Sequence, residues 1–154
     1  MPRMSWDNYF MRMAKDAATR ATCDRASVGA VIVDPEDHQT LVTGYNGAPR
    51  KLPHCDEEGH LLINNHCVRV VHAEINAICQ AARRGIALKG ATLYIAGYFP
   101  CLNCMKAIIQ AGIKKVVYEK EFHSPEYEIE FNIAKSFAEK SGIELICLNP
   151  QKRD

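Results

Sequence analysis

The chain has 154 residues, of which 47% are hydrophobic and 24% are charged, and its formal net charge is +1. This length suits one domain with a sizeable core. The near-zero charge excludes the strongly basic surface that binds nucleic acid without sequence preference. No apolar run approaches the roughly 20 residues of a membrane helix, and the first residues lack the apolar segment of a secretory signal. We therefore expect a cytoplasmic protein without a membrane or nucleic-acid partner.

The first third of the chain predicts one helix followed by a hairpin. Ser5 is a suitable N-cap for a helix that begins at Trp6 and continues at helical spacing through Thr22. Residues 28–33 form an apolar run typical of a buried strand, and residues 40–45 pair with it after a turn. Residues 46–67 are irregular, and a loop of this length in a compact domain is usually functional or held by a bound group.

The remainder alternates helix and strand. Helices are predicted at residues 72–84, 100–111 and 125–140, and strands at 91–96, 114–118 and 143–148. The order α-β-β-α-β-α-β-α-β predicts an antiparallel hairpin followed by parallel strands joined through right-handed crossovers. The expected fold class is therefore α/β, as a single domain over residues 1–154. Its architecture is a three-layer α/β/α sandwich with a five-stranded mixed sheet.

Two short motifs carry the chemistry. The first is His72-Ala73-Glu74 and the second is Pro100-Cys101-Leu102-Asn103-Cys104. One imidazole and two thiolates suit zinc, and three protein ligands leave the fourth tetrahedral position for water, as in catalytic zinc sites. Glu74 is available as a proton carrier. This combination is the signature of zinc-dependent nucleoside and nucleotide deaminases.

Each motif alone has other interpretations. A lone C-x-x-C could be a redox pair or half of a zinc ribbon, and a further Cys or His could complete a closed structural site. The two motifs occur in order, with 29 residues from His72 to Cys101 and a proline directly before the first cysteine. A closed structural site would leave Glu74 without a role, so the combination favours a catalytic zinc.

A second group of potential ligands lies in and near the irregular segment. Cys23, Cys55, His60 and Cys67 could form a Cys₃His structural zinc site. His66 competes with His60 for the fourth position. The alternative is that these residues are free thiols and surface histidines.

The motifs together resemble one family, deoxycytidylate (dCMP) deaminase, particularly its bacterial and phage branch. The stretches that carry the resemblance are Thr22-Cys23-Asp24-Arg25, Gly44-Tyr45-Asn46-Gly47, His66-Cys67-x-Arg69-x-x-His72-Ala73-Glu74 and Pro100-Cys101-x-x-Cys104. The resemblance implies a cytidine deaminase-like fold. It also implies hydrolysis of dCMP to dUMP and ammonia through a zinc-activated water, a step of pyrimidine metabolism that supplies dUMP for thymidylate synthesis.

The resemblance also implies roles for individual residues. The catalytic zinc ligands would be His72, Cys101 and Cys104, and Glu74 would be the general acid/base. The substrate-binding residues would be Arg25 at the 5′-phosphate, Asn46 at the sugar, Ala73, and Tyr118 closing the pocket. Related bacterial sequences often have a cysteine at the position of His60, which favours His60 over His66 as a ligand of the second, structural zinc.

Regulation and assembly are further implications. Relatives are commonly homohexamers that are activated by dCTP and inhibited by dTTP, and Mg²⁺ would accompany such a triphosphate effector. One departure from the family concerns Ile95 to Pro100, which contains one extra residue in the stretch that lines the pocket floor of relatives.

Three alternative functions share parts of the pattern. A tRNA adenosine deaminase has the same ligand motifs, but the near-neutral charge disfavours a nucleic-acid groove. Another nucleotide or nucleoside deaminase of the superfamily is a second alternative. A non-catalytic binding module, for example in DNA uptake, is the third, and the intact ligand set with Glu74 disfavours it.

Overall fold

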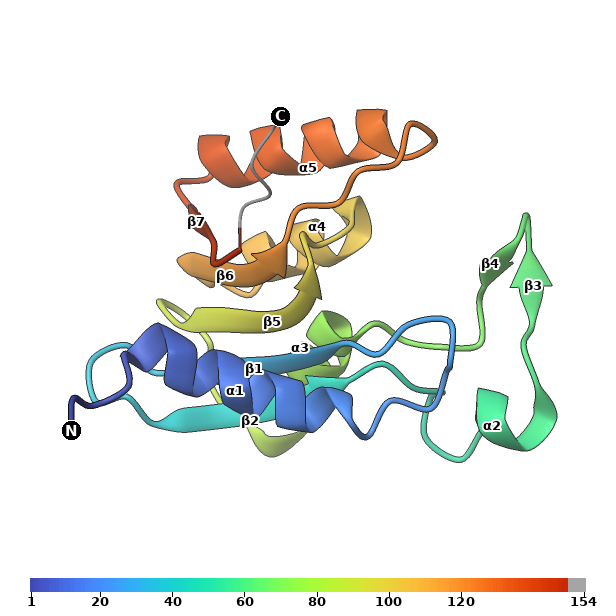
Figure 1. Cartoon of the computed structure of the whole chain (residues 1–154), viewed down its shortest axis with the longest axis horizontal. Helices are drawn as coiled ribbons and strands as arrows, with labels where there is room; N and C mark the ends of the chain where they lie inside the picture. Colours follow the sequence, from blue (N-terminus) through green and yellow to red (C-terminus); the bar gives the residue numbers. More distant parts are fainter. Residues whose placement is uncertain (150–154) are drawn as a thin grey trace.

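A computed structural model describes residues 1–149 and shows a five-stranded sheet with helices on both faces (Figure 1). The strands of this sheet are β1 (Gly29–Val33), β2 (Thr40–Tyr45), β5 (Thr92–Tyr98), β6 (Lys115–Lys120) and β7 (Glu144–Cys147). The helices beside it are α1 (Trp6–Ala18), α3 (Ala73–Arg84), α4 (Leu102–Gln110) and α5 (Glu128–Lys140). The predicted α/β/α sandwich is confirmed. The expectation of one domain over 1–154 includes residues 150–154, which lie outside the described part.

The strand order is β2-β1-β5-β6-β7. Strand β1 pairs antiparallel with both β2 and β5, and β5, β6 and β7 are parallel to one another. The mixed sheet and its hairpin are therefore as predicted. In parallel sheets, functional residues gather beyond the carboxyl ends of the strands, and here that edge carries the segment after β5.

Alternation along β1 divides the core into two layers. Val31 and Val33 belong to a cluster with Phe10 and Ala14 of α1. Ala30 and Ile32, which alternate with them along β1, belong to the larger cluster built with α3, α4 and α5. Because successive strand side chains point to opposite faces, one apolar strand serves both layers. All five residues of β1 are accordingly buried.

Two glycines allow the helices to approach the hairpin closely. A Cβ added at Gly29 would lie 1.9 Å from the carbonyl oxygen of Ala14, and one at Gly44 would lie 2.5 Å from that of Ala73. Any side chain at Gly44 would therefore displace the first turn of α3. This close contact fixes the end of α3 that carries His72 and Glu74.

The segment predicted to be irregular contains short elements that sequence analysis did not identify. They are α2 (Cys55–Glu58), β3 (Leu62–Ile63) and β4 (His66–Cys67). The β3–β4 hairpin projects from the body of the molecule (Figure 1). Its turn has Asn64 and Asn65 at φ 48° and 60°, a left-handed conformation that asparagine tolerates. Such short elements cannot show the hydrophobic periodicity from which helices and strands are predicted.

Several element boundaries differ from the prediction by one to four residues. Helix α1 ends at Ala18 rather than Thr22, and α5 begins at Glu128 rather than at Pro125. Strand β5 continues to Tyr98, and its pairing with β6 shifts register between Ile95 and Tyr98. Within residues 1–149, no helix is long and apolar enough to cross a membrane.

Candidate active site

The first turns of α3 and α4 meet at one point. His72 is the N-cap residue of α3, and Cys101 is the N-cap residue of α4. Both have extended backbone and no side-chain capping hydrogen bond, so their side chains remain available. The partial positive charge at each helix N-terminus stabilises thiolates and other anions placed there. The expectation that both motifs lie at helix N-termini is confirmed.

Three ligand atoms converge between these helices. Nδ1 of His72 lies 3.6 Å from Sγ of Cys101 and 3.4 Å from Sγ of Cys104. All three ligand atoms lie within 4.8 Å of one another. This spacing matches ligands arranged around one ion, because Zn–S and Zn–N bonds are about 2.0–2.3 Å long. The residues present therefore fit a zinc ion held by one imidazole and two thiols.

Electrostatics at this cluster favour the thiolate of Cys101, whereas the hydrogen bond with Cys101 and burial raise the pKa of Cys104. A hydrogen bond with Cys104 and another with His72 lower the pKa of Cys101 to about 4. The same contact with Cys101 raises the pKa of His72. Metal ligation requires deprotonated sulfur. A metal ion held between these groups would supply the positive charge that a protonated His72 supplies in its absence.

Glu74 lies beside the three ligands without joining them. It is the second residue of α3 and is 5% exposed. Its carboxylate contacts the thiol of Cys104, and burial raises the pKa of Glu74. A carboxyl group that is driven toward its neutral form can both accept and return a proton near neutral pH.

A cleft of about 450 Å³ opens in front of this group. Its lining includes His72, Ala73, Glu74 and Cys101. Further lining residues are Cys23, Arg25, Ala26, Val28, Asn46, His66 and Cys67. The walls are predominantly apolar with a few convergent polar groups, which is typical of a small-molecule site.

The structure brings three of the four predicted substrate-binding residues to this cleft. Arg25 lines it while its guanidinium donates to the carbonyl oxygen of Asn65 at 2.7 Å. Asn46 lines it and is 4% exposed, with Oδ1 accepting from the Val28 amide. Ala73 is fully buried at the base of the cleft. Their roles toward a substrate stay predictions.

The structure places Tyr118 in the core beside Phe99, and its role in closing the pocket stays a prediction. Its ring is 5.3 Å from that of Phe99 in an edge contact, and its hydroxyl donates to Glu121 at 2.5 Å. Tyr118 is 4% exposed and is not among the residues that line the cleft. Alternation along β6 points this side chain into the core layer under α5 instead.

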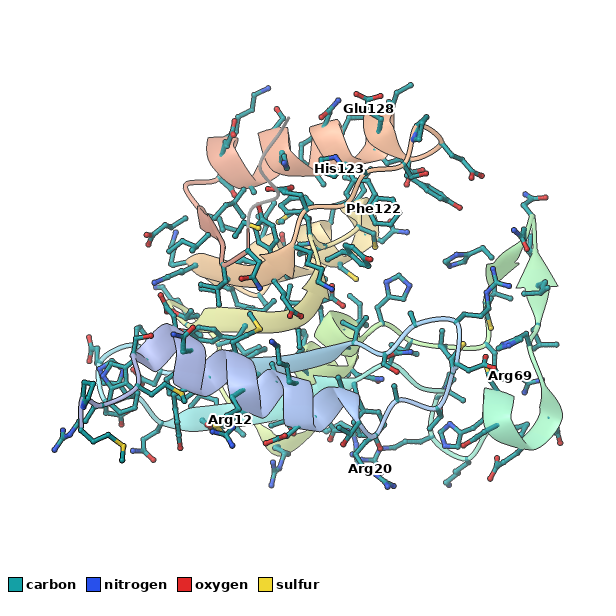
Figure 2. All side chains as sticks on the ribbon, viewed as in Figure 1. Arg12, Arg20, Arg69, Phe122, His123 and Glu128 are labelled. Atoms are coloured by element: carbon teal, nitrogen blue, oxygen red, sulfur yellow. The ribbon has the colours of Figure 1, made fainter. Side chains whose placement is uncertain are left out.

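Other aromatic side chains do line the cleft. The cleft is lined by Tyr98, Phe99, Phe122 and Phe131. Phe122 lies on the segment between β6 and α5 (Figure 2), and its ring meets that of Tyr98 edge-on at 5.4 Å. The sequence signal for Tyr98 and Phe99 was the extra residue before Pro100. In the structure, the pairing of β5 with β6 shifts register in the same stretch. No sequence signal identified Phe122 or Phe131.

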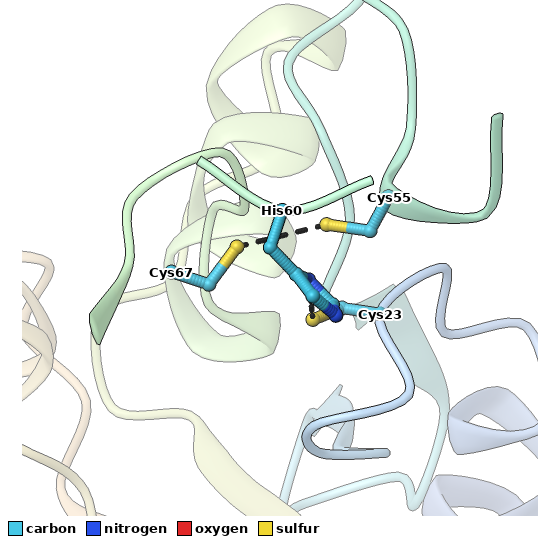
Figure 3. Close-up of side chains that lie close together, drawn as sticks. All are labelled: Cys23, Cys55, His60 and Cys67. Carbon is cyan, nitrogen blue, oxygen red and sulfur yellow. Dashed lines mark hydrogen bonds between the residues drawn. The ribbon is translucent and has the colours of Figure 1, made fainter. Parts of the chain in front are cut away.

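A second cluster forms from the irregular segment and the end of the first loop. Cys23, Cys55, His60 and Cys67 each offer one ligand atom, and these atoms lie within 4.8 Å of one another (Figure 3). Sγ of Cys55 is 3.6 Å from Sγ of Cys67, and Nδ1 of His60 is 3.7 Å from Sγ of Cys23. Three thiols and one imidazole are a typical structural zinc set.

The geometry distinguishes between His60 and His66, which the sequence left as alternative ligands of the second zinc. His60 joins the cluster, whereas His66 lines the substrate cleft, with its ring centroid 6.2 Å from that of His72. Burial opposes ionisation of Cys67, but hydrogen bonds from the Arg69 amide and from His60 lower the pKa of Cys67 to about 6. Arg69 also donates to the Pro53 carbonyl at 3.1 Å, beside α2 (Figure 2). It thereby connects the two ends of this segment.

An α/β sandwich with His and C-x-x-C ligands at two helix N-termini, together with a nearby buried glutamate, defines a zinc-dependent deaminase. Comparisons with known proteins agree. The family model described as cytidine and deoxycytidylate deaminase zinc-binding region matches residues 4–120. The chain belongs to the cytidine and deoxycytidylate deaminase family.

Individual relatives extend this result. The chain is 43% identical over 143 residues to ComE operon protein 2 of Bacillus subtilis, covering 93% of this chain and 71% of that protein. It is 40% identical over 130 residues to deoxycytidylate deaminase of Saccharomyces cerevisiae, covering 80% of this chain and 40% of that longer protein. The dCMP deaminase of cyanophage S-TIM5, solved with dCMP and dUMP, superimposes with a TM-score of 0.77 at 26% identity. That match covers 96% of this chain and 100% of the phage chain.

Proposed function

We propose that the protein is a hydrolase that converts dCMP to dUMP and ammonia and so supplies dUMP for thymidylate synthesis. The observation that carries this proposal is the convergence of His72, Cys101 and Cys104 beside buried Glu74, at the base of a cleft lined by Arg25. A relative named deoxycytidylate deaminase and a superimposable phage enzyme solved with dCMP and dUMP support the choice of substrate.

The proposed mechanism assigns distinct tasks to the residues of the cleft. Zinc, when held by His72, Cys101 and Cys104, lowers the pKa of a water molecule and so supplies a nucleophile at neutral pH. Glu74 accepts a proton from the attacking water and passes it to N3 of the pyrimidine. It then takes the remaining proton of the hydroxyl added at C4 and delivers it to the leaving amine, so that the C4 carbonyl forms as ammonia departs. The raised pKa of Glu74 suits a group that must carry protons in both directions.

Substrate binding divides between an apolar and a cationic end. The aromatic rings of Phe99, Phe122 and Phe131 offer flat surfaces for the pyrimidine and exclude water from it. Arg25 also lines the cleft, and its guanidinium would pair with the 5′-phosphate. Asn46 lies beside it as the proposed sugar contact, and the backbone of Ala73 faces the reacting end of the base.

We also propose a second, structural zinc bound by Cys23, Cys55, His60 and Cys67. Its support is the closeness of four suitable ligand atoms contributed by three separate segments. A segment as long as 46–67 loses much conformational entropy on folding, and a metal that crosslinks it offsets this cost. The bound metal would also hold Cys23 and Cys67 in the wall of the substrate cleft.

Regulation and assembly complete the proposal. A separate cleft of about 530 Å³ is bounded by Arg50, Lys51, Arg83 and Arg84, a cationic setting for a triphosphate such as dCTP or dTTP with Mg²⁺.

Helix α5 exposes Ile129, Ile133 and Phe137 at i, i+4 and i+8, an apolar stripe consistent with contacts in a homohexamer. We further propose a cytoplasmic location, with which the absence of disulfides among the seven cysteines is consistent.

A substrate panel tests the main proposal. Purified protein with measured zinc content is incubated with dCMP, CMP, dCTP, deoxycytidine and a tRNA anticodon stem. We expect kcat/KM for deamination, followed as release of ammonia, to be highest with dCMP, and the product from dCMP to be dUMP. Preference for the tRNA stem would establish the adenosine deaminase alternative, and no turnover of any substrate by zinc-loaded protein would establish a binding module.

A further inference from the structure

His60 uses both of its ring nitrogens in the structure. Nδ1 faces the thiol of Cys23 at 3.7 Å, within the four-residue cluster. Nε2 lies 3.0 Å from Oδ1 of Asp24, on the far side of the ring. The imidazole therefore bridges the cluster and a carboxylate (Figure 3 shows the cluster side).

This arrangement determines which nitrogen can bind a metal. A neutral imidazole carries one N–H and one lone pair. If Nε2–H donates to the carboxylate of Asp24, the lone pair of Nδ1 points at the three thiols. A carboxylate in this position also makes the ligating nitrogen more basic, and such partners typically contribute 10–100-fold to metal affinity.

Asp24 itself is not a fifth ligand. Its side chain is 88% exposed, and it is not a member of the group of mutually close ligand atoms. The neighbouring cation, Arg25, directs its guanidinium to the carbonyl oxygen of Asn65 instead. The carboxylate of Asp24 therefore contacts His60 rather than Arg25.

We propose that Asp24 is a positioning residue for the second metal, which selects the Nε2–H tautomer of His60 and orients Nδ1 toward the ion. This inference rests on the structural zinc proposed above. It explains why Nδ1 rather than Nε2 of His60 faces the thiols, because a carboxylate that accepts from Nε2–H fixes the tautomer and the orientation of the ring.

The position of Asp24 in the chain connects this site to the substrate cleft. Cys23 and Arg25, on either side of it, both line that cleft. The contact of Asp24 with His60 thus restrains a three-residue segment that contains one metal ligand and the proposed phosphate-binding residue. Weaker metal binding at His60 would loosen both neighbours together.

Zinc affinity provides the test, with the full chain and Zn²⁺ as the probe. Zinc stoichiometry is measured first, and the ions are then titrated away with a chromophoric chelator. Asp24→Ala should lower the affinity of one of two zinc ions by about 10–100-fold. Asp24→Asn, whose amide oxygen still accepts from Nε2–H, should lose less. Asp56→Ala is the matched control, because Asp56 is exposed and adjacent to the ligand Cys55.

Two results would contradict the inference in different ways. If wild-type protein binds two zinc ions and Asp24→Ala releases both as wild type does, Asp24 has no positioning role although the second site exists. If wild-type protein binds a single zinc ion, the structural site itself is absent and the inference falls with it. Cobalt substitution gives an independent readout, since Asp24→Ala should shift the visible bands of the site that contains His60.

Discussion

Glu74 and Arg25 show how different environments give charged residues different tasks. Glu74 is 5% exposed and shares its surroundings with the metal ligands. Burial raises its pKa and prepares it for proton transfer. Arg25 lies at the exposed wall of the cleft and keeps a permanent charge, which suits recognition of an anion.

Replacing Glu74 by Gln should separate metal binding from chemistry. Glutamine keeps the size of the side chain and cannot carry the proton, so we expect kcat with dCMP to fall by at least ~10²–10⁴-fold while the zinc content stays unchanged. Steady-state kinetics and metal analysis on the same sample provide the measurement. Glu139→Gln, on the exposed side of α5, is the control. Near-normal turnover by Glu74→Gln would show that another group moves the proton.

Replacing Arg25 by Ala should affect the phosphate-bearing substrate selectively. We expect KM for dCMP to rise by about tenfold or more, since a charge-assisted hydrogen bond contributes roughly 1.5–3 kcal/mol, while deoxycytidine is turned over nearly as by wild type. Arg25→Lys should recover part of the loss. Because Arg25 also donates to Asn65, an equal loss for both substrates would instead mean that it only anchors the β3–β4 hairpin.

At the scale of elements, helix ends and a strand irregularity create the site. The N-termini of α3 and α4 bring His72 and Cys101 together although they are 29 positions apart. The register shift in β5 then places Phe99 in the cleft rather than in the regular alternation. Behind Phe99, α5 contributes Lys135, whose Nζ lies 5.4 Å from the ring centroid.

The contact between β6 and α5 predicts a pH dependence of stability. Glu121 accepts from Tyr118 at 2.5 Å and from Lys135 at 2.9 Å. Burial opposes its ionisation, but these hydrogen bonds and the charge of Lys135 lower the pKa of Glu121. The resulting stabilisation is present above the unfolded-state pKa of about 4.3 and is lost as pH falls through the lower folded-state pKa.

Glu121→Gln tests this dependence. At pH 7 we expect its Tm to be roughly 2–4 °C below that of wild type, corresponding to about 1 kcal/mol. Below about pH 4 the difference should shrink as Glu121 of the wild type becomes protonated. Thermal unfolding followed by circular dichroism between pH 3 and 7 measures it. A difference that stays constant over this range would assign the effect to packing rather than to charge.

At the scale of the whole molecule, two ligand clusters border one cleft. His72 and Cys101 of the first cluster line this cleft, and so do Cys23 and Cys67 of the second. Cys67 is only five residues before His72, so the segment that closes the second cluster leads directly into α3. Stability of the projecting α2 and β3–β4 region should therefore depend on the second cluster.

Cys67→Ser tests this dependence. We expect one zinc ion per chain instead of two, and a Tm lowered by several degrees, because a structural metal contributes folding free energy directly. Amide hydrogen exchange should increase in residues 46–67 and change little in the central strands. Cys79→Ser, at an exposed cysteine of α3, is the control. Unchanged stoichiometry, Tm and exchange in Cys67→Ser would mean that packing alone holds this segment.

Local sequence was sufficient for much of the fold and for the catalytic ligands. The apolar runs of β1 and β5, the cap at Ser5 and the left-handed Gly85 were readable because each depends on near neighbours. The ligands His72, Cys101 and Cys104 were readable because zinc restricts residue type and spacing so strongly.

The tertiary structure alone decided which distant side chains face the cleft. His60 and His66 are chemically identical, and only the β3–β4 hairpin directs one to the second cluster and the other to the cleft. Tyr118 and Phe122 are both aromatic and four positions apart, yet only Phe122 reaches the cleft. Strand alternation turns Tyr118 into the core, while Phe122 lies in the segment after β6. Such orientations depend on register and on contacts between segments far apart in the chain, which residue type and spacing do not specify.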